Sequence, residues 1–489
     1  MAVVVWLTAG VLVLTAYLLH WQTRVKPSNA PTLHSSFVQK VKHLGGMTAL
    51  LHSAYKTHNQ GTFQYVTIRG RRQVVVSSDK LITELKNAPH EILSFARWTQ
   101  DLIEFDTILP LYTGGQKLVQ WPPLVQKLTH RFFKGPMTKD LATNFPDLFD
   151  DLVYGFSKAP QDAPVYTLVR CAVLPAVARQ IIGAPLCRDE EFLKNTDEMT
   201  HLFGVAPQLA GMFPGKFLKR LAVRYLTRWE TVKRYIEEAC EAQAKDLNRP
   251  KGKDFFSLSL AAIEMNGAKG TGEMWDIPRL ATEVCSNFFA AHHTTSATIA
   301  MALLELAVRP EYQPILREEV RQAVDEKGWS MDAIDSLEKL DSFLVEMRRW
   351  RPLADMMLNR AVIRETTLSD GTILKPGTYI SASYSARQLD PRYYTSPEEF
   401  DGMRFYKLRK EGDQGRLFTD VDGTLHLGFG GGKHPCPGRF FATAVVKLGI
   451  AYLLNQYQVL PGSEKLEMEM HFEEQRLPSM KDKVVFKKL

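Results

Sequence analysis

Residues Gly428 to Ala442 read GFGGGKHPCPGRFFA and combine a glycine-rich run with one cysteine set between two prolines. Glycine-rich runs often cradle phosphate groups. A Walker loop, however, needs a glycine five residues before the glycine that precedes its lysine, and Ser or Thr after that lysine. Here Leu427 and His434 occupy those positions, and a GxGxxG motif fails at Lys433. The stretch therefore favours a role centred on Cys436 over phosphate binding.

The spacing around this cysteine is Phe429-x-x-Gly432-x-x-x-Cys436-x-Gly438. It resembles the haem-thiolate loop of the cytochrome P450 family, and the resemblance implies that Cys436 is the axial ligand of a haem iron, where a thiolate favours O–O cleavage. Glycines let a backbone approach a flat macrocycle closely. The apolar helix expected over Arg439–Leu454 would direct backbone N–H groups toward the thiolate. The expected cofactor-binding residues are Cys436, Phe429, Gly432, His434, Gly438 and Arg439.

One position of this loop departs from the family pattern. The family often has arginine two residues before the cysteine, where this chain has His434. Histidine can still donate a hydrogen bond to a haem propionate, and the run HPCPGRFFA is similar to the fungal, membrane-bound branch of the family. A further propionate contact is expected near Trp121. Lys127, His130 and Arg131 remain alternatives for it, because the usual basic position holds valine.

Two further motifs together supply one acid and two arginines that are expected to form a cluster. Glu346-Met347-Arg348-Arg349 matches the ExxR motif of the family, and residues three apart lie on one face of a helix. An isolated ExxR is a weak signal, because exposed pairs of this kind are frequent and contribute little. Phe400 to Phe405 resembles the F-x-P-x-R-F element of the family, with Gly402 in place of proline. Arg404 would then complete a structural triad with Glu346 and Arg349.

The segment Ala290-Ala291-His292-His293-Thr294-Thr295 is similar to the oxygen-binding helix of the family. Thr294 matches the hydroxyl that positions water for proton delivery, and His293 stands where the family has an acid. His293 could relay protons in place of that acid. The alternative is a histidine satisfied within the protein, on the helix face away from the haem. His292 and His293 are not expected to share a metal ion, because adjacent helical side chains point about 100° apart.

The composition is that of an ordinary globular chain. Of 489 residues, 45% are hydrophobic and 24% are charged, which excludes a disordered chain. The net charge of +7 is spread without a dense basic run, so no nucleic-acid partner is expected. The five cysteines form no CxxC pair, which argues against disulfides or zinc and for a reducing compartment. Four of them are expected to be inert buried thiols: Cys171, Cys187, Cys240 and Cys285.

The N-terminal residues predict a membrane anchor. Residues 1–23 contain no charged side chain, and Ala2–Trp21 has about the 20 residues that a bilayer-spanning helix needs. Arg24 and Lys26 follow at once, which predicts a cytosolic catalytic part. A cleaved signal peptide is the alternative, but the run lacks a basic start and a small-residue cleavage site. We expect a single-pass endoplasmic-reticulum protein with an anchor at 1–23, a linker at 24–35 and a haem domain at 36–489.

Hydrophobic periodicity predicts a mainly α-helical fold with a small β region. Helices are expected over Ala281–Val308, Gln313–Val324 and Leu337–Trp350. Strands are expected at Phe63–Ile68 and Gln73–Ser77, with a hairpin around Ser369-Asp370-Gly371. Length alone suggests about three domains. The motifs between Thr294 and Cys436 must instead meet at one haem, so a single cytochrome P450 fold is expected.

The resemblance implies a monooxygenase that inserts one oxygen atom from O₂ into a lipophilic small molecule. Haem b would be the cofactor, with electrons from NADPH through a separate NADPH-cytochrome P450 reductase and cytochrome b5 as an optional second donor. Likeness to fungal members favours secondary-metabolite substrates, terpenoid or meroterpenoid before polyketide or indole alkaloid. Two alternatives stay open. One is a haem-thiolate isomerase or dehydratase that uses no O₂, and the other is a membrane-bound haem sensor or carrier.

Overall fold

The computed structural model describes most of the chain after its N-terminal segment. The described residues are 28–33, 45–58, 61–67, 70–102, 131–211, 213, 215–246, 248, 252–266, 277–413, 416–421 and 423–489. The anchor expected at 1–23 lies outside them and stays a prediction, as does the division into anchor, linker and haem domain. Among the described residues, no helix is both long and apolar enough to cross a bilayer.

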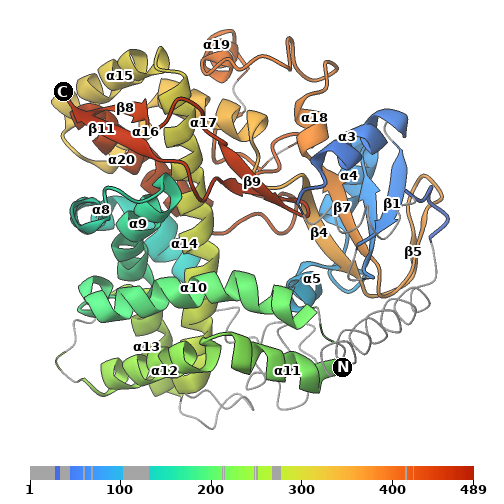
Figure 1. Cartoon of the computed structure of the whole chain (residues 1–489), viewed down its shortest axis with the longest axis horizontal. Coiled ribbons are helices and arrows are strands. Elements are labelled where there is room, and N and C mark those ends of the chain that lie inside the picture. Colours follow the sequence, from blue (N-terminus) through green and yellow to red (C-terminus); the bar gives the residue numbers. More distant parts are fainter. Residues whose placement is uncertain are drawn as a thin grey trace, which may run out of the picture.

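Helices make up most of the described chain, as the sequence periodicity predicts (Figure 1). They are α3 (Thr48–Thr57), α4 (Asp79–Asn87), α5 (Phe95–Leu102), α8 (Leu141–Lys158), α9 (Val165–Ile181), α10 (Glu190–Gly211), α11 (Gly215–Leu226), α12 (Trp229–Lys245), α13 (Phe255–Asn266), α14 (Ile277–Val308), α15 (Tyr312–Lys327), α16 (Met331–Asp335), α17 (Glu338–Trp350), α18 (Ser385–Gln388), α19 (Arg404–Lys410) and α20 (Arg439–Gln456). Two short turns of other helix types, Gly135–Lys139 and Leu186–Arg188, lie at either end of the α8–α9 pair.

In the described part of the chain, the strands form one five-stranded sheet and three two-stranded sheets. They are β1 (Thr62–Val66), β2 (Arg72–Val76), β3 (Leu93–Ser94), β4 (Met356–Val362), β5 (Thr366–Thr367), β6 (Ile373–Leu374), β7 (Tyr379–Ser383), β8 (Tyr457–Pro461), β9 (Glu469–Phe472), β10 (Gln475–Pro478) and β11 (Val484–Lys488). The main sheet has the order β1-β2-β7-β4-β3, in which β2 and β7 are parallel. It therefore joins the N-terminal part of the chain to residues about 300 positions later.

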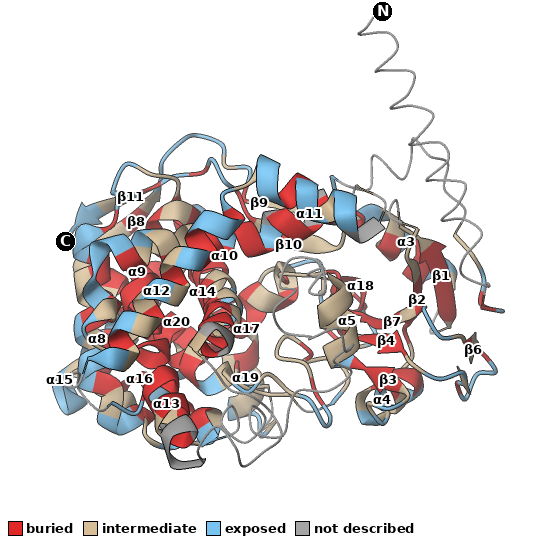
Figure 2. Cartoon of the chain, turned by 90° about the horizontal axis from the view of Figure 1, so that it is seen from below, coloured by how far each residue is buried: buried red, intermediate tan, exposed pale blue. Residues whose placement is uncertain are grey.

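Alternation along β2 gives this sheet two apolar faces. Successive side chains of a strand point to opposite faces. Val74 and Val76 pack with Leu81 and Leu85 of α4 in one cluster, while Val75 belongs to a second cluster with Met47, Leu51 and Ala54 around α3. The sheet is thus buried between α3 and α4 (Figure 2).

The largest core belongs to the helices that surround α14. All side chains from Ile299 to Leu304 are fully buried, and α14 packs against α9, α12 and α20. The helix is uniformly apolar in this half because neighbours cover it on every side. It runs through the helical part of the molecule, opposite the sheet (Figure 1).

The expected elements are present at nearly the expected bounds. α14, α15, α17 and α20 occupy the four predicted helical stretches. β1 and β2, which overlap the two predicted strands, pair in antiparallel register. The strands β5 and β6 flank Gly371, whose φ of 84° is the left-handed geometry that glycine tolerates best. The prediction of a mainly helical fold with a small β region is confirmed.

Candidate functional site

Cys436 lies in a closed loop directly before α20. Its backbone N–H donates to the carbonyl of Phe429 at 2.7 Å, which joins the two ends of the predicted motif. Gly438 is the residue that precedes the first turn of α20, and its carbonyl accepts from Ala442 at 2.9 Å. Cys436 therefore stands next to the positive end of a helix of 18 residues.

Gly432 lets this loop pack against the backbone of α4. Its φ is 66°, and a Cβ there would lie 2.3 Å from the carbonyl oxygen of Lys86. Any side chain at this position would force the loop and α4 apart. Glycine is therefore required at position 432 because the loop backbone lies directly against the backbone of α4.

Burial and local dipoles act on Cys436 in opposite directions. Burial raises the pKa of the thiol, while the Gly438 backbone N–H and the Arg439 charge lower it. Arg439 also donates from Nη1 to the Cys436 carbonyl at 3.1 Å. Burial outweighs these two effects, so the pKa of the thiol lies above its ordinary value, and binding of a cation to the sulfur would favour the thiolate.

A buried arginine and a histidine near the loop fit an acidic cofactor. Arg360 of β4 is 3% exposed, its Nη2 has no hydrogen-bond partner, and burial lowers its pKa to about 10. Among the described residues it makes no ion pair. Burial and then Arg360 lower the pKa of His434. A buried arginine is costly without an anion, so Arg360 and His434 fit the two carboxylates of a haem.

Arg360 is a site residue that the sequence interpretation missed. It follows Leu358, which has a φ of 57° at an irregularity in the pairing of β4 with β7. Such irregularities redirect side chains. The available signal was an arginine inside the otherwise mainly apolar strand MMLNRAV.

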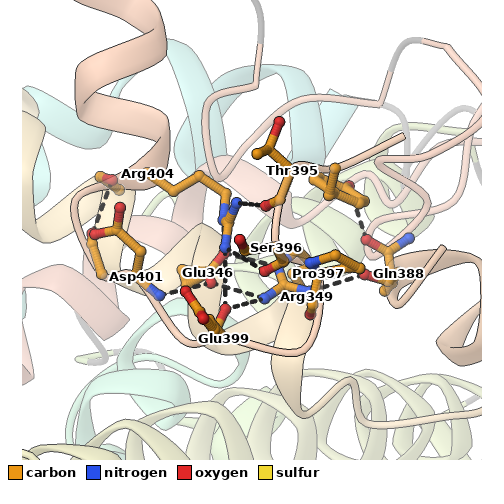
Figure 3. Close-up of polar contacts among 12 residues, drawn as sticks. Glu346, Arg349, Gln388, Thr395, Ser396, Pro397, Glu399, Asp401 and Arg404 are labelled. Carbon is orange, nitrogen blue, oxygen red and sulfur yellow. Dashed lines mark hydrogen bonds and ion pairs between the residues drawn. The ribbon is translucent and has the colours of Figure 1, made fainter. Parts of the chain in front are cut away.

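The predicted acid–arginine triad is assembled as expected (Figure 3). Glu346, fully buried, accepts two hydrogen bonds from Arg349, at 2.7 and 2.8 Å, and one from Arg404 at 3.2 Å. Its Oε1 also accepts the N–H of Asp401 at 2.9 Å.

Both arginines of this triad also hold the chain that follows β7. Arg349 donates to the carbonyls of Gln388, Pro397 and Glu399, at 2.7 to 3.0 Å. Arg404 donates to the carbonyls of Thr395, Ser396 and Glu399, at 2.5 to 3.2 Å. α17 is thereby fastened to the segment that leads toward the cysteine loop.

Thr294 lies on the open side of α14. Ala290 and Thr294 are exposed, whereas His292, Thr295 and Ser296 are buried. The Thr294 hydroxyl donates to the Ala290 carbonyl at 2.7 Å, and Thr298 repeats the bond one turn later at 2.8 Å. This strip of small residues and hydroxyls leaves room beside the helix.

The two histidines before Thr294 point to other helices. His292 contacts the Arg170 carbonyl of α9 through Nε2 at 2.8 Å and the Thr200 hydroxyl of α10 through Nδ1 at 3.3 Å. His293 contacts the Tyr166 hydroxyl of α9 through Nδ1 at 3.0 Å, and its ring lies near Phe289. Burial, then His292 and Arg170, lower the pKa of His293 to about 3. Its relay role stays a prediction. The Tyr166 contact satisfies Nδ1, as the alternative of a histidine held within the protein expects, but Nε2 is buried without a hydrogen-bond partner.

The other predicted residues are the candidates for a second propionate contact and the cysteines other than Cys436. Trp121, Lys127 and His130 lie outside the described residues, and Arg131 is exposed. The thiols apart from Cys436 have pKa values raised by burial, to about 11 for Cys187 and about 12 for Cys285. In the described part of the chain, no group of three or more His, Cys, Asp or Glu side chains could hold a metal ion.

Comparison with known proteins agrees with this geometry. The cytochrome P450 family model matches residues 31–486. The chain therefore belongs to the cytochrome P450 family, and it is a monooxygenase of that family, with a haem-thiolate cofactor and electrons from a redox partner.

Several relatives to which the chain is similar are fungal enzymes. Cytochrome P450 monooxygenase 71 of Postia placenta is 30% identical, with 91% of this chain and 90% of the relative covered. Cytochrome P450 monooxygenase janQ of Penicillium janthinellum is 28% identical, with 90% and 89% covered. Ent-kaurene oxidase of Gibberella intermedia is 30% identical, with 77% and 72% covered. A retinoic acid-bound cyanobacterial CYP120A1 structure shares the fold, with a TM-score of 0.66 and 18% identity, over 89% of this chain and 94% of that one.

Proposed function

We propose that this chain inserts one oxygen atom from O₂ into a lipophilic terpenoid or meroterpenoid in fungal secondary metabolism. The observation that carries the reaction type is the closed Cys436 loop at the start of α20. The substrate class is supported by similarity to a relative whose name states that it oxidises ent-kaurene. Polyketides and indole alkaloids are the alternative substrates.

Each candidate site residue has a defined task in this proposal. The haem, bound as haem b, supplies the binding and activation of O₂. Cys436 holds the iron, and Arg360 and His434 hold the propionates. Thr294, with its hydroxyl on the open strip of α14, holds a water molecule that delivers protons. The electrons come from NADPH through a separate reductase, with cytochrome b5 as an optional second donor.

The first experiment tests the iron ligand. The purified full-length protein should show a thiolate-type Soret band in its reduced-CO difference spectrum. Cys436→Ser should lose that band and the NADPH-dependent product formation. Cys171→Ser, a partly buried thiol of α9, is the matched control and should keep both. A histidine-type band in the wild-type protein would overturn the assignment.

A second measurement identifies the reaction. Microsomes with the protein and a reductase are supplied with terpenoid, polyketide and indole-alkaloid precursors under ¹⁸O₂. The proposal expects NADPH-dependent products that carry one ¹⁸O atom, with terpenoids turned over fastest. Product formation without NADPH and without ¹⁸O would instead establish an isomerase or dehydratase.

The proposed location is the endoplasmic-reticulum membrane, with the catalytic part in the cytosol. Support comes from the apolar run at 1–23 and from α11. Phe217, Tyr225 and Leu226 of α11 are 60 to 75% exposed, and Figure 2 shows the exposed residues along this helix. Exposed aromatic and apolar side chains on a helix with basic residues are typical of contact with a lipid surface. Phe217→Ser should weaken sedimentation of a protein lacking residues 1–23 with phosphatidylserine-containing vesicles.

A further inference from the structure

Arg348 of α17 lies against the cysteine loop. It stands between Glu346 and Arg349 in sequence, yet it takes no part in their triad. Its Nη1 donates to the Phe418 carbonyl at 2.8 Å, and its guanidinium lies 4.3 Å from the ring of Phe418 and 5.2 Å from the ring of Phe429. A Cβ on Gly428 would come within 2.4 Å of the Arg348 Cδ. The side chain is therefore wedged against the first two residues of the loop.

The charge of Arg348 is not neutralised by a direct partner. Its Nη2 is buried without a hydrogen bond, and among the described residues Arg348 makes no ion pair with a carboxylate. Asp341 and Asp420 act on it only from a distance. Asp341 already binds Arg409 at 3.3 Å and Lys447 at 3.0 Å, and Asp420 accepts the N–H of Leu417 at 2.7 Å. Nearby His426 is neutral, because burial and then Arg348 lower its pKa to about 3. One buried positive charge therefore remains behind the loop.

Phe429 connects this charge to the cysteine. Its ring contacts the Arg348 guanidinium and packs edge-on against Phe418, with 5.5 Å between the ring centroids. Its carbonyl accepts the N–H of Cys436 at 2.7 Å. Arg348 thus holds the side chain of the residue whose backbone holds Cys436.

We propose that Arg348 is a positioning residue that fixes Phe429 and whose buried charge raises the reduction potential of the haem iron. The inference rests on the proposed haem-thiolate function. A positive charge in a low-dielectric interior favours the reduced form, which carries one more electron. Burial and neighbouring dipoles are established means by which proteins set haem potentials. With the Arg348 charge in this position, the haem would be easier to reduce than it would be without that charge.

The test compares reduction potentials of purified holoproteins. Arg348→Met removes the charge and keeps a long apolar side chain, so the ferric/ferrous potential should shift to a more negative value. Arg348→Lys keeps the charge and should shift the potential less. Arg321→Met, at an exposed position of α15, makes the same change in net charge and should leave the potential unchanged. Haem content and the ferrous-CO band of each variant show whether the thiolate is still bound.

Gly428→Ala provides an independent variant that leaves Arg348 in the sequence. Its methyl group would push the flexible Arg348 side chain out of its place, so the potential should again become more negative. The proposal would be overturned if Arg348→Met or Gly428→Ala kept the thiolate ligand and had the same reduction potential as Arg321→Met. Loss of the proposed function is a different result, because the wild-type protein itself would then lack the thiolate-type band.

Discussion

At the scale of single residues, Gly402 shows how this chain departs from its family without loss of the motif. The family element has proline here. The Gly402 N–H donates to the Tyr312 hydroxyl at 3.0 Å, and a Cβ would lie 2.8 Å from Tyr312 Cε1 and 2.9 Å from Phe343 Cδ2. Proline would remove the donor and add atoms where the two rings lie. The position of the Tyr312 side chain therefore requires glycine at 402.

We expect Gly402→Pro to lower the free energy of unfolding by about 1–3 kcal/mol, from a lost hydrogen bond and overpacking. Urea unfolding of the purified protein measures this change. Gly204→Ala is the control, because no heavy atom lies within 4 Å of a Cβ there, and helical alanine is expected to be neutral or stabilising by up to about 1 kcal/mol. A Gly402→Pro protein as stable as the wild type would contradict this account.

His293 links local burial to pH dependence. Its pKa is about 3 in the folded protein, against an ordinary value of 6.5. Burial is the largest cause of this shift, and His292 and Arg170 lower the pKa further. Between these two pH values the unfolded chain binds a proton that the folded chain does not. Stability therefore falls as pH drops from about 6.5 toward 3, by about 1.4 kcal/mol per pH unit for one such group.

His293→Gln cannot titrate and should lose this part of the acid sensitivity. We expect its stability relative to the wild type to improve by about 1 kcal/mol or more between pH 7 and pH 5. Urea unfolding at both pH values measures the difference. His90→Gln, at an exposed side chain, is the surface control. An equal pH dependence of the His293→Gln and wild-type proteins would refute the assignment.

At the scale of elements, neighbouring residues of α17 contact two different segments of the chain. Glu346 and Arg349 face the segment from Gln388 to Arg404, while Arg348 faces the cysteine loop. Adjacent helical side chains point about 100° apart, so one turn of helix can hold both. The position of α17 thereby sets the position of both segments on either side of α19.

Glu346→Ala should abolish haem incorporation. It would leave the buried Arg349 and the partly buried Arg404 without their acid, which costs about 3–5 kcal/mol, and it would free the segment that carries Arg404. The haem content per purified protein and the reduced-CO spectrum report the loss. Glu338→Ala on the same helix removes an exposed pair with Lys410 and should keep the haem. A Glu346→Ala protein with normal haem content would disprove the structural role.

At the scale of the whole molecule, an ionic network joins the helical part to the sheet. Glu305 of α14 is fully buried and binds Arg309 and Arg351. Arg351 binds Glu469 of β9 at 3.3 Å, and Glu469 binds Arg476 of β10 at 2.9 Å. Arg476 then reaches Asp355, directly before β4, at 3.7 Å. Figure 1 shows β9 between the two parts of the molecule.

Glu469→Gln should weaken this connection and lower the free energy of unfolding by about 3 kcal/mol, because Arg351 and Arg476 lose a shared acid. Burial raises the pKa of Glu469, but Arg476 and Arg351 outweigh it and hold the pKa below its ordinary 4.5. The stabilising contribution is thus present above pH 4.5 and is lost as pH falls below that value. Thermal unfolding at pH 7 measures the effect. Glu467→Ala, in an exposed pair with Lys481, should change stability by less than about 1 kcal/mol.

The family and the positions of the long helices could be predicted from local sequence patterns, and the same patterns predict Cys436 as the iron ligand. Cys436, Glu346, Arg349 and Arg404 were identifiable because they stand in short motifs whose spacing resembles that of the family. Long helices were predictable because their apolar periodicity is local.

The tertiary structure alone decided the partners of the other charged and aromatic residues. Arg360 and Arg348 were not identified from the sequence, because an arginine becomes significant only where burial leaves its charge without an acid. The contacts of Gly402 with Tyr312 and of His293 with Tyr166 join residues 90 and 127 positions apart. Such pairings depend on how the helices pack, which no local pattern records.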